Sequence, residues 1–231
     1  AIIEMARFSF STMIFDIVTI FPKIFNSYLG ESIIKRALKK GLIKIKVNDL
    51  RKWTTDRHRT VDDRPFGGGP GMALKIEPLS KAINSIMKSK KRGQRLKTKI
   101  ILFSPRGKQF DNRVASRLAK NYHHLVLICG RYEGIDERLK KIFKAEEISI
   151  GPYVLSGGEL PAMILTETVA RQIPGVLGKI ESLEEKRLGV GVPVYTRPEA
   201  FVFKNKRYSV PRILLSGNHA KIEEWRRKHR K

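Results

Sequence analysis

Three short apolar segments in the middle of this 231-residue chain each end at a turn-forming sequence. They are TKIILFSP (98–105), HHLVLICG (123–130) and EEISIG (146–151). The segment DNRVASRLAK, with Asp111 as its expected N-cap, separates the first two, and GELPAMILTETVARQI (158–173) follows the third. Apolar residues recur at helical spacing in this last segment. Strands that alternate with helices predict an α/β fold built on a parallel sheet.

The residues before this region extend the same pattern. MIFDIVTI (13–20) is rich in apolar and β-branched residues, as expected of a buried strand, and IKIKVNDL (43–50) alternates as a half-buried strand does. ESIIKRALKKG (31–41) and IEPLSKAINSIMKSKKRG (76–93) are expected to be helices. Each of them ends at a glycine, and the second has Pro78 in its first turn.

The turns that follow the three central strands are the candidate ligand site. Ligands of parallel α/β sheets bind outside the carboxyl ends of the strands, so we expect FSPRG, CGRYEG and SIGPYVLSGG to form one pocket. The third turn has no lysine and matches no common phosphate-loop pattern. The second turn has two interpretations. Either Glu133 faces a ligand cation while the glycines permit close approach, or the segment is only a strand-to-helix turn capped by Asp136.

The stretch RKWTTDRHRTVDDRPFGGGPG (51–71) is predicted to contain no regular structure. Its most turn-dense part, DRPFGGGPGM (63–72), is not a phosphate loop, because no Lys-Ser/Thr pair follows. We interpret it as a mobile flap over a site, and a plain linker is the alternative.

Histidine and cysteine offer little for catalysis or metal binding. His123 and His124 have no carboxylate or cysteine at ligand spacing and are expected to be structural. Cys129 is the single cysteine, which excludes an internal disulfide and a cysteine-based metal site. It is expected to be a small buried side chain. Nucleophilic and metal-dependent hydrolysis are not indicated, and no metal site is predicted.

The charge of the chain indicates an acidic partner. Lys and Arg total 47 against 22 Asp and Glu, a formal net charge of +25. Nucleic acid is the first candidate and an anionic membrane surface the second. The basic runs KSKKRGQRLKTK (88–99) and EEWRRKHRK (223–231) favour contacts to phosphates. Trp53 and Trp225 lie beside basic residues, where each either stacks on a base or is buried.

Neither a membrane span nor a signal peptide is recognised in the sequence. The longest apolar runs are too short to cross a bilayer, and the one near the start contains Asp16 and Pro22. Glu4 and Arg7 interrupt the N-terminus. A cytoplasmic protein with no membrane partner is therefore expected.

Six motifs then follow one another along the chain. They are TVDDRPFGGGPGM, CGRYEGIDERL, SIGPYVLSGGELPAM, RQIPGVLG, YTRPEAF and LLSGNHAKIEEWRRK. In this order they resemble the bacterial tRNA (guanine-N1)-methyltransferases of the TrmD type, which are members of the SPOUT superfamily. The resemblance covers residues 13–231 and leaves residues 1–12 as an N-terminal extension.

The resemblance implies an enzyme that transfers a methyl group from S-adenosylmethionine to tRNA. The acceptor is N1 of the guanine at position 37, next to the anticodon and preceded by guanine 36. A deep trefoil knot in the parallel sheet and a homodimer with shared active sites are also implied. The expected organisation is a knotted methyltransferase domain (1–174), a linker (175–197) and a small helical tRNA-binding domain (198–231). The sequence leaves open whether Mg²⁺ assists.

Site residues follow from the same resemblance. The cofactor is expected to contact Ser104, Pro105, Gly130, Glu133, Ser149, Ile150, Gly151, Tyr153, Leu155, Gly157 and Gly158. The tRNA is expected to contact Arg64, Ser216, His219 and Trp225. Arg171 matches the arginine that stabilises negative charge on guanine O6. The family's catalytic aspartate corresponds to Lys186 here, so the proton acceptor is assigned to Glu185, with Glu184 and Lys186 as alternatives.

Two other functions stay open at this point. The departure at Lys186 allows a relative that binds RNA and cofactor but is catalytically impaired, although the complete cofactor loop argues against it. The second is an enzyme of the same fold that methylates another RNA base.

Overall fold

The computed structural model describes residues 12–89, 97–178 and 191–230. The chain divides into two units, Ala1–Leu177 and Gly178–Lys231, and each is described by itself. The first unit holds a five-stranded sheet in the order β2-β1-β6-β5-β7. All four strand pairs of this sheet are parallel. The predicted α/β fold with a parallel sheet is therefore confirmed.

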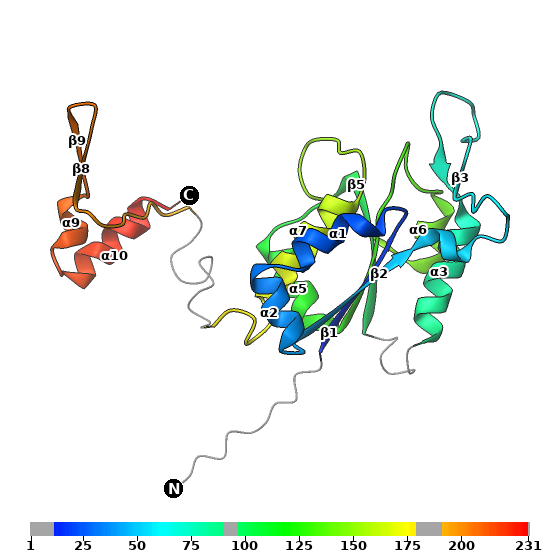
Figure 1. Ribbon diagram of the computed structural model, residues 1–231, viewed down its shortest axis with the longest axis horizontal. Helices are drawn as coiled ribbons and strands as arrows, with labels where there is room; N and C mark the ends of the chain where they lie inside the picture. Colours follow the sequence, from blue (N-terminus) through cyan, green and yellow to red (C-terminus); the bar gives the residue numbers. More distant parts are fainter. Residues whose placement is uncertain (1–11, 90–96, 179–190, 231) are drawn as a thin grey trace, which may run out of the picture. The chain divides into compact units, whose positions relative to one another are not determined.

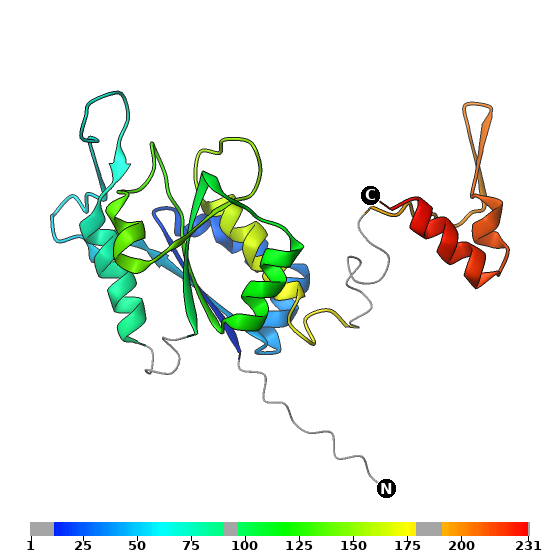
Figure 2. The ribbon, with the colours of Figure 1, turned by 180° about the vertical axis from the view of Figure 1, so that it is seen from behind.

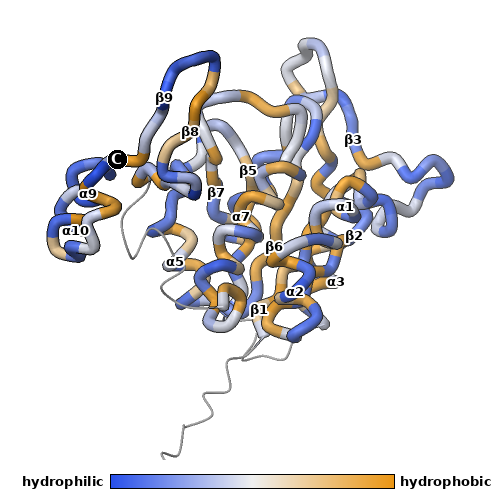
Figure 3. Tube along the Cα trace, turned by 60° about the vertical axis from the view of Figure 1, so that its left-hand side comes forward, coloured by the Kyte–Doolittle hydropathy of each residue, from blue (hydrophilic) through white to orange (hydrophobic). Residues whose placement is uncertain are grey.

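The strands begin and end close to the predicted segments. In order along the chain they are β1 (Met13–Thr19), β2 (Ile43–Asp49), β5 (Thr98–Gln109), β6 (His124–Ile128) and β7 (Glu146–Ser149). Figure 3 shows hydrophobic residues running along the strands of the sheet. Every residue of β6 is buried, because the sheet is covered on both faces.

Helices cover the two faces of this sheet in separate groups (Figures 1 and 2). On one face lie α1 (Phe25–Leu29), α2 (Ser32–Lys39), α5 (Asn112–Asn121) and α7 (Glu159–Arg171). They pack on a core that includes Phe15, Leu125 and Leu127. On the other face α3 (Ile76–Lys88) and α6 (Arg138–Phe143) pack on Val18, Val126 and Ile128. Alternate residues of β1, β5 and β6 thus enter different cores.

Local signals account for the helix ends. Asp111 is the N-cap of α5, because its side chain accepts a hydrogen bond of 2.8 Å from the Val114 N–H, as predicted. Pro78 lies in the first turn of α3, where its missing N–H costs nothing. Gly41 has a φ of +69° just after α2, in the left-handed region that ends many helices.

Several elements were not predicted. A 3-10 turn η1 (Pro22–Ile24) and helix α1 follow β1. The expectation that residues 51–71 lack regular structure is wrong in two places. A second 3-10 turn, η2 (Leu50–Trp53), begins the stretch, and β3 (Asp62–Asp63) pairs antiparallel with β4 (Ala73–Leu74).

The expected structural roles of the histidines and the cysteine can be compared with their contacts. His124 is buried, and its Nε2 lies 2.8 Å from the Asp16 carboxylate while its Nδ1 lies 3.0 Å from the Thr98 hydroxyl. This is a satisfied core histidine, as expected. Burial lowers the pKa of His123, and Lys97 acts in the same direction. Cys129 is buried in the core, and burial raises the pKa of its thiol well above the usual range.

The second unit contains a β-hairpin as well as helices. Strands β8 (Ala200–Phe203) and β9 (Lys206–Ser209) pair antiparallel. Helices α9 (Arg212–Leu215) and α10 (His219–Lys228) follow. Asn218 caps α10 by accepting a hydrogen bond of 3.1 Å from the Lys221 N–H. The basic C-terminal helix was predicted and the hairpin was not.

Candidate active site

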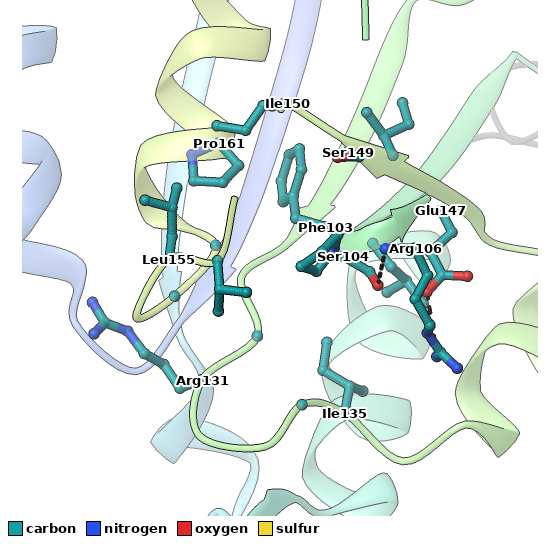
Figure 4. A pocket seen from close by; sticks show the side chains of 18 of the residues that line it. Phe103, Ser104, Arg106, Arg131, Ile135, Glu147, Ser149, Ile150, Leu155 and Pro161 are labelled. Atoms are coloured by element: carbon teal, nitrogen blue, oxygen red, sulfur yellow. Dashed lines mark hydrogen bonds and ion pairs between the residues drawn. The ribbon is translucent and has the colours of Figure 1, made fainter. Parts of the chain in front are cut away.

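A cavity of about 500 Å³ opens beside residues 102–106 of β5 and the carboxyl ends of β6 and β7. Residues of all three predicted turn segments line it, so the expectation that these segments form one pocket is confirmed (Figure 4). All eleven residues expected to contact the cofactor line this cavity. They are Ser104, Pro105, Gly130, Glu133, Ser149, Ile150, Gly151, Tyr153, Leu155, Gly157 and Gly158.

The first wall is a bulge within β5. The predicted strand end at residue 105 is wrong, because β5 pairs with β7 on both sides of the bulge, and the register shifts between Phe103 and Lys108. The intervening residues line the cavity, where Ser104 Oγ accepts a hydrogen bond of 3.2 Å from the Arg106 N–H (Figure 4). Gly107 returns the chain to the sheet. A Cβ there would lie 2.6 Å from the backbone of Ile148. Only glycine fits this approach.

The second and third walls are joined to each other. The Gly158 N–H donates a hydrogen bond of 2.9 Å to the Gly130 carbonyl, and Arg131 and Gly157 form an antiparallel bridge. A Cβ on Gly158 would lie 2.7 Å from Cα of Cys129. A backbone contact of this kind cannot be relieved by a side-chain rotation. The glycine pair thus lets the loop after β7 cross directly over the end of β6.

The loop after β7 is also held by its own side chains. Ser149 Oγ donates a hydrogen bond of 3.0 Å to the Gly151 carbonyl, and the Tyr153 hydroxyl donates one of 3.3 Å to the Ile150 carbonyl. A Cβ on Gly151 would overlap the Tyr153 ring. Figure 4 shows Ile150, Leu155 and Pro161 on one side of the cavity, facing Phe103. This side offers apolar surface beside exposed loop backbone.

A buried ion pair fixes the join between the walls, and the sequence analysis missed it. Glu159, the first residue of α7, is only 2% exposed. Its Oε2 accepts a hydrogen bond of 2.9 Å from Arg131 Nε, and its Oε1 accepts one of 2.7 Å from the Thr19 hydroxyl. The Arg131 guanidinium lies 4.7 Å from the centre of the Phe21 ring. Figure 4 shows this guanidinium directed away from the other lining side chains.

Glu133 lies at the mouth of the cavity, beside the glycine-rich loop of residues 63–72. The Glu133 side chain is exposed, and its backbone N–H donates a hydrogen bond of 2.9 Å to the Met72 carbonyl. A Cβ on Gly71, which has a φ of +90°, would lie 2.7 Å from Cγ of Glu133. Phe66, at the tip of the loop, is fully exposed. The loop therefore borders the cavity mouth, as a flap would. That the loop moves stays a prediction.

Charged side chains form the remaining side of the cavity. Arg106 Nη2 lies 3.2 Å from Glu137 Oε2 and 3.5 Å from Glu147 Oε1. The pKa of Glu147 is lowered, first because the Lys140 ammonium donates a hydrogen bond to its carboxylate. Asp136 accepts hydrogen bonds from the backbone and guanidinium of Arg138, which lower its pKa.

Helix α7 separates two of the predicted functional groups. Its N-terminus carries the glycine pair of the cavity, while Arg171 is its last residue. A helix of this length spans about 20 Å. Accordingly, Arg171 is not among the residues that line the cavity. Glu184, Glu185 and Lys186, the candidates for the proton acceptor, lie outside the described residues.

The four residues expected to contact tRNA are distributed over both units. Arg64 is exposed in the glycine-rich loop of the first unit. Ser216 and His219 are exposed in the second unit, between α9 and the start of α10. Trp225 is half-buried, with its ring 4.1 Å from that of His229 and 6.4 Å from that of Tyr195. Trp53 in the first unit packs against the core under α3.

Within the described residues, no group of three or more His, Cys, Asp or Glu side chains is arranged to hold a metal ion. Every helix in residues 12–89, 97–178 and 191–230 is too short or too polar to cross a lipid bilayer.

Comparison with known proteins identifies the family of this chain. Residues 13–231 match the family model described as tRNA (Guanine-1)-methyltransferase TrmD. A tRNA (guanine-N(1)-)-methyltransferase of Dictyoglomus turgidum is 50% identical over 216 residues, covering 92% of this chain and 83% of the relative. One from Thermomicrobium roseum is 50% identical over 218 residues, covering 93% of this chain and 78% of the relative.

A solved structure extends the likeness to the fold. The tRNA (m1G37) methyltransferase from Aquifex aeolicus aligns with a TM-score of 0.75 and 38% identity. The alignment covers 94% of this chain and 89% of that one. The family model, the relatives and the solved structure thus lead to one conclusion, that this chain belongs to the TrmD family of tRNA (guanine-1)-methyltransferases.

Proposed function

We propose that this chain transfers a methyl group from S-adenosylmethionine to N1 of the guanine at position 37 of tRNA, where guanine 36 precedes it. The observation that carries the proposal is the single cavity lined by all eleven expected cofactor residues, in a chain of this family. The names of the relatives support this function rather than an impaired or re-targeted relative. Because the substrate is tRNA, we expect the enzyme to act in the cytoplasm.

The residues of the cavity suit S-adenosylmethionine. This cofactor supplies a methyl group activated by attachment to a sulfonium sulfur. Ile150, Leu155 and Pro161 offer apolar surface for the flat adenine, and the neighbouring loop backbone offers groups that can read its edge. The exposed carboxylate of Glu133 can pair with the cationic amine of the cofactor's amino-acid part. No phosphate needs a partner, which agrees with the absence of lysine from the loop.

Methyl transfer also requires that guanine N1 lose its proton. As the proton leaves, negative charge moves toward O6, and Arg171 is proposed to stabilise it. Glu185 is proposed to accept the proton, with Glu184 and Lys186 as the competing assignments. Positioning of the two reactants supplies much of the remaining rate enhancement, because the transfer itself needs little further chemistry.

A homodimer with shared sites is part of the proposal. Arg171 and the glycine pair lie at opposite ends of α7, about 20 Å apart. This separation, and the absence of Arg171 from the cavity lining, support an arrangement in which the Arg171 that serves one cavity comes from a second copy. A deep trefoil knot is likewise proposed for the sheet. In support, the chain after β7 crosses the end of β6, where Gly157 pairs with Arg131. The second unit is proposed to bind tRNA.

Mixed dimers test the shared site directly. We would combine Arg171→Ala chains with Glu133→Lys chains, whose reversed charge repels the cofactor amine. If each site draws Arg171 from the other chain, a mixed dimer has one intact site, and an equal mixture recovers about a quarter of the wild-type activity. If both residues act within one chain, every mixture stays inactive. Each variant alone is the control.

The activity itself is tested with tRNA transcripts that differ at positions 36 and 37. Methyl incorporation only where both are guanine, mapped to N1 of the second, is the expected result. Cofactor binding without methyl transfer to any transcript would contradict the proposal and favour an RNA-binding relative.

A further inference from the structure

The hairpin of the second unit presents three aromatic rings on one face. Directly opposed residues of an antiparallel pair share a face, and Phe201 is opposite Tyr208 while Phe203 is opposite Lys206. These four side chains therefore lie on one side of the two-stranded ribbon, and Val202 and Arg207 lie on the other. Phe201 is 57% exposed, Phe203 54% and Tyr208 51%. Contiguous exposed apolar patches often mark interaction sites.

Two of the three rings, those of Phe203 and Tyr208, have a lysine ammonium over them. Those of Phe201 and Phe203 are 6.4 Å apart and within 14° of parallel. Lys204 Nζ lies 5.6 Å from the centre of the Phe203 ring, and Lys206 Nζ lies 5.5 Å from that of Tyr208. We call this set of five residues, Phe201, Phe203, Lys204, Lys206 and Tyr208, the hairpin face. Flat π surfaces beside ammonium groups are the two components that bind single-stranded nucleic acid.

The turn at the tip of the hairpin holds Lys204 in a backbone conformation that is unfavourable for lysine. Lys204 and Asn205 have φ values of +46° and +58°. A two-residue hairpin turn with both φ values positive suits the twist of the strands, but it normally takes asparagine and glycine. A lysine in this position is strained. Such strain is a reason to look for a function of the side chain that the turn displays.

The charge around the hairpin identifies the class of partner. Residues 197–212 contain Arg197, Lys204, Lys206, Arg207 and Arg212 against a single acidic residue, Glu199. This excess repels a second copy of the same surface and attracts a polyanion. Among polyanions, one that also offers flat rings matches the aromatic side chains best, and unpaired bases of RNA are such rings.

We propose that the hairpin face stacks on unpaired bases of the bound tRNA, while Lys204 and Lys206 contact the adjacent phosphates. The proposal rests on the proposed function, since it takes tRNA as the ligand of this chain. It adds a contact surface beyond the four residues expected from the resemblance. A stacking surface of this kind adds affinity with little sequence preference, because every base has a π face.

Leucine substitutions test the stacking. Phe201→Leu and Phe203→Leu keep an apolar side chain while removing the ring. The double variant is expected to bind an unmodified tRNA transcript about tenfold more weakly, and to raise the KM for tRNA with little change in kcat. Affinity for S-adenosylmethionine should not change. Phe201→Tyr keeps a ring and should retain the wild-type affinity, and Val202→Ala, on the opposite face, is the matched control.

The lysines are tested by salt dependence. Lys204→Gln and Lys206→Gln should each lower the slope of log affinity against log salt by about 0.7, the value for one phosphate contact to a single strand. Circular dichroism and thermal melting of every variant establish that the second unit is still folded.

Two results would overturn the proposal. The first is a folded leucine variant that binds tRNA as tightly as the wild-type chain does, including one that instead loses binding to phosphatidylserine vesicles or loses self-association. The second is a Phe201→Tyr variant that loses tRNA binding although it keeps the ring, which would exclude stacking as the cause. Failure of the wild-type chain to bind or methylate tRNA is a different result, because it contradicts the proposed function itself.

Discussion

Arg131 Nε donates a hydrogen bond of 2.9 Å to Oε2 of Glu159, joining the turn after β6 to the first residue of α7. The two residues belong to the two walls of the cavity that approach each other through Gly130 and Gly158. Glu159 is buried, so its carboxylate is held by Arg131 and the Thr19 hydroxyl rather than by water. The pair therefore sets the spacing of two loops without itself pointing into the cavity.

Glu159→Gln is expected to loosen this spacing. The neutral amide has one acceptor oxygen, so it cannot accept from both Arg131 and the Thr19 hydroxyl as the carboxylate does, and it removes the negative charge beside Arg131. We expect a loss of about 1–3 kcal/mol in the free energy of unfolding, together with several-fold weaker binding of S-adenosylmethionine. Calorimetric titration and urea unfolding measure the two effects. Glu31→Gln, at an exposed ion pair with Lys35, is the control and should change neither. Unchanged cofactor affinity in a folded Glu159→Gln chain would exclude a positioning role.

Gly158→Ala is expected to disrupt the crossing of the two loops. The added methyl would meet the backbone of Cys129 at 2.7 Å, so the loop after β7 must move. We expect at least tenfold weaker cofactor binding and a lower melting temperature. Gly178→Ala is the matched control, because nothing lies within 4 Å of a Cβ at that position. Equal behaviour of the two variants would show that the close approach is not required.

The pH dependence of stability should depend in part on Glu147. Its pKa is lowered in the folded chain, mainly by the hydrogen bond from Lys140, while in the unfolded chain it returns to its ordinary value near 4.5. The unfolded state therefore binds the proton more tightly, and Glu147 stabilises the fold above that pH. This stabilisation is lost as the pH falls through the lower, folded pKa.

Urea unfolding across a pH series measures this contribution. Glu147→Gln should be less stable than the wild-type chain at neutral pH and should lose less stability on acidification. Lys140→Met should act in the same direction, because it removes the first cause of the lowered pKa. If both variants lose stability on acidification as steeply as the wild-type chain does, Glu147 does not contribute to the pH dependence of stability.

Turnover should depend on Arg171 and on one residue of the segment 184–186. Glu185→Gln is expected to lower kcat about a hundredfold or more, as for loss of a general base, and Arg171→Ala is expected to lower it comparably. Cofactor affinity should be nearly unchanged in both, and single-turnover methylation separates the two quantities. If Glu185→Gln keeps the wild-type rate while Lys186→Ala or Glu184→Gln loses it, the proton acceptor is reassigned accordingly.

The strands of the sheet could be predicted from the sequence because burial on both faces produces continuous apolar runs. LVLI in β6 is an example, since its residues alternate between two cores. The order of the strands in the sheet could not be predicted from the sequence. It depends on pairs that are far apart in sequence, such as Ile14 and His124. Helix α1 was missed because it is short and buries only Phe25, and the β8–β9 hairpin was missed because its turn, Lys204–Asn205, contains no glycine.

The turns after the predicted strands indicated that three segments form one pocket, and the family resemblance named its residues, whereas neither predicted the ion pair behind the pocket. An acidic residue in the first turn of a helix is common, because it complements the helix dipole at the surface. Glu159 therefore looked ordinary in the sequence, and only its burial and its contact with Thr19, 140 residues away, distinguish it. The short register shift in β5 is similarly invisible to a pattern of apolar residues.

The length of α7 has a consequence for how the enzyme would respond to dilution. If its two ends serve cavities in different chains, separated chains can still capture the cofactor but cannot complete a transfer. At protein concentrations below the dissociation constant of the dimer, specific activity would then fall while cofactor binding per chain stays constant. In that range the reaction rate would become second order in protein concentration, so the cellular level of the chain would itself set how much tRNA is modified.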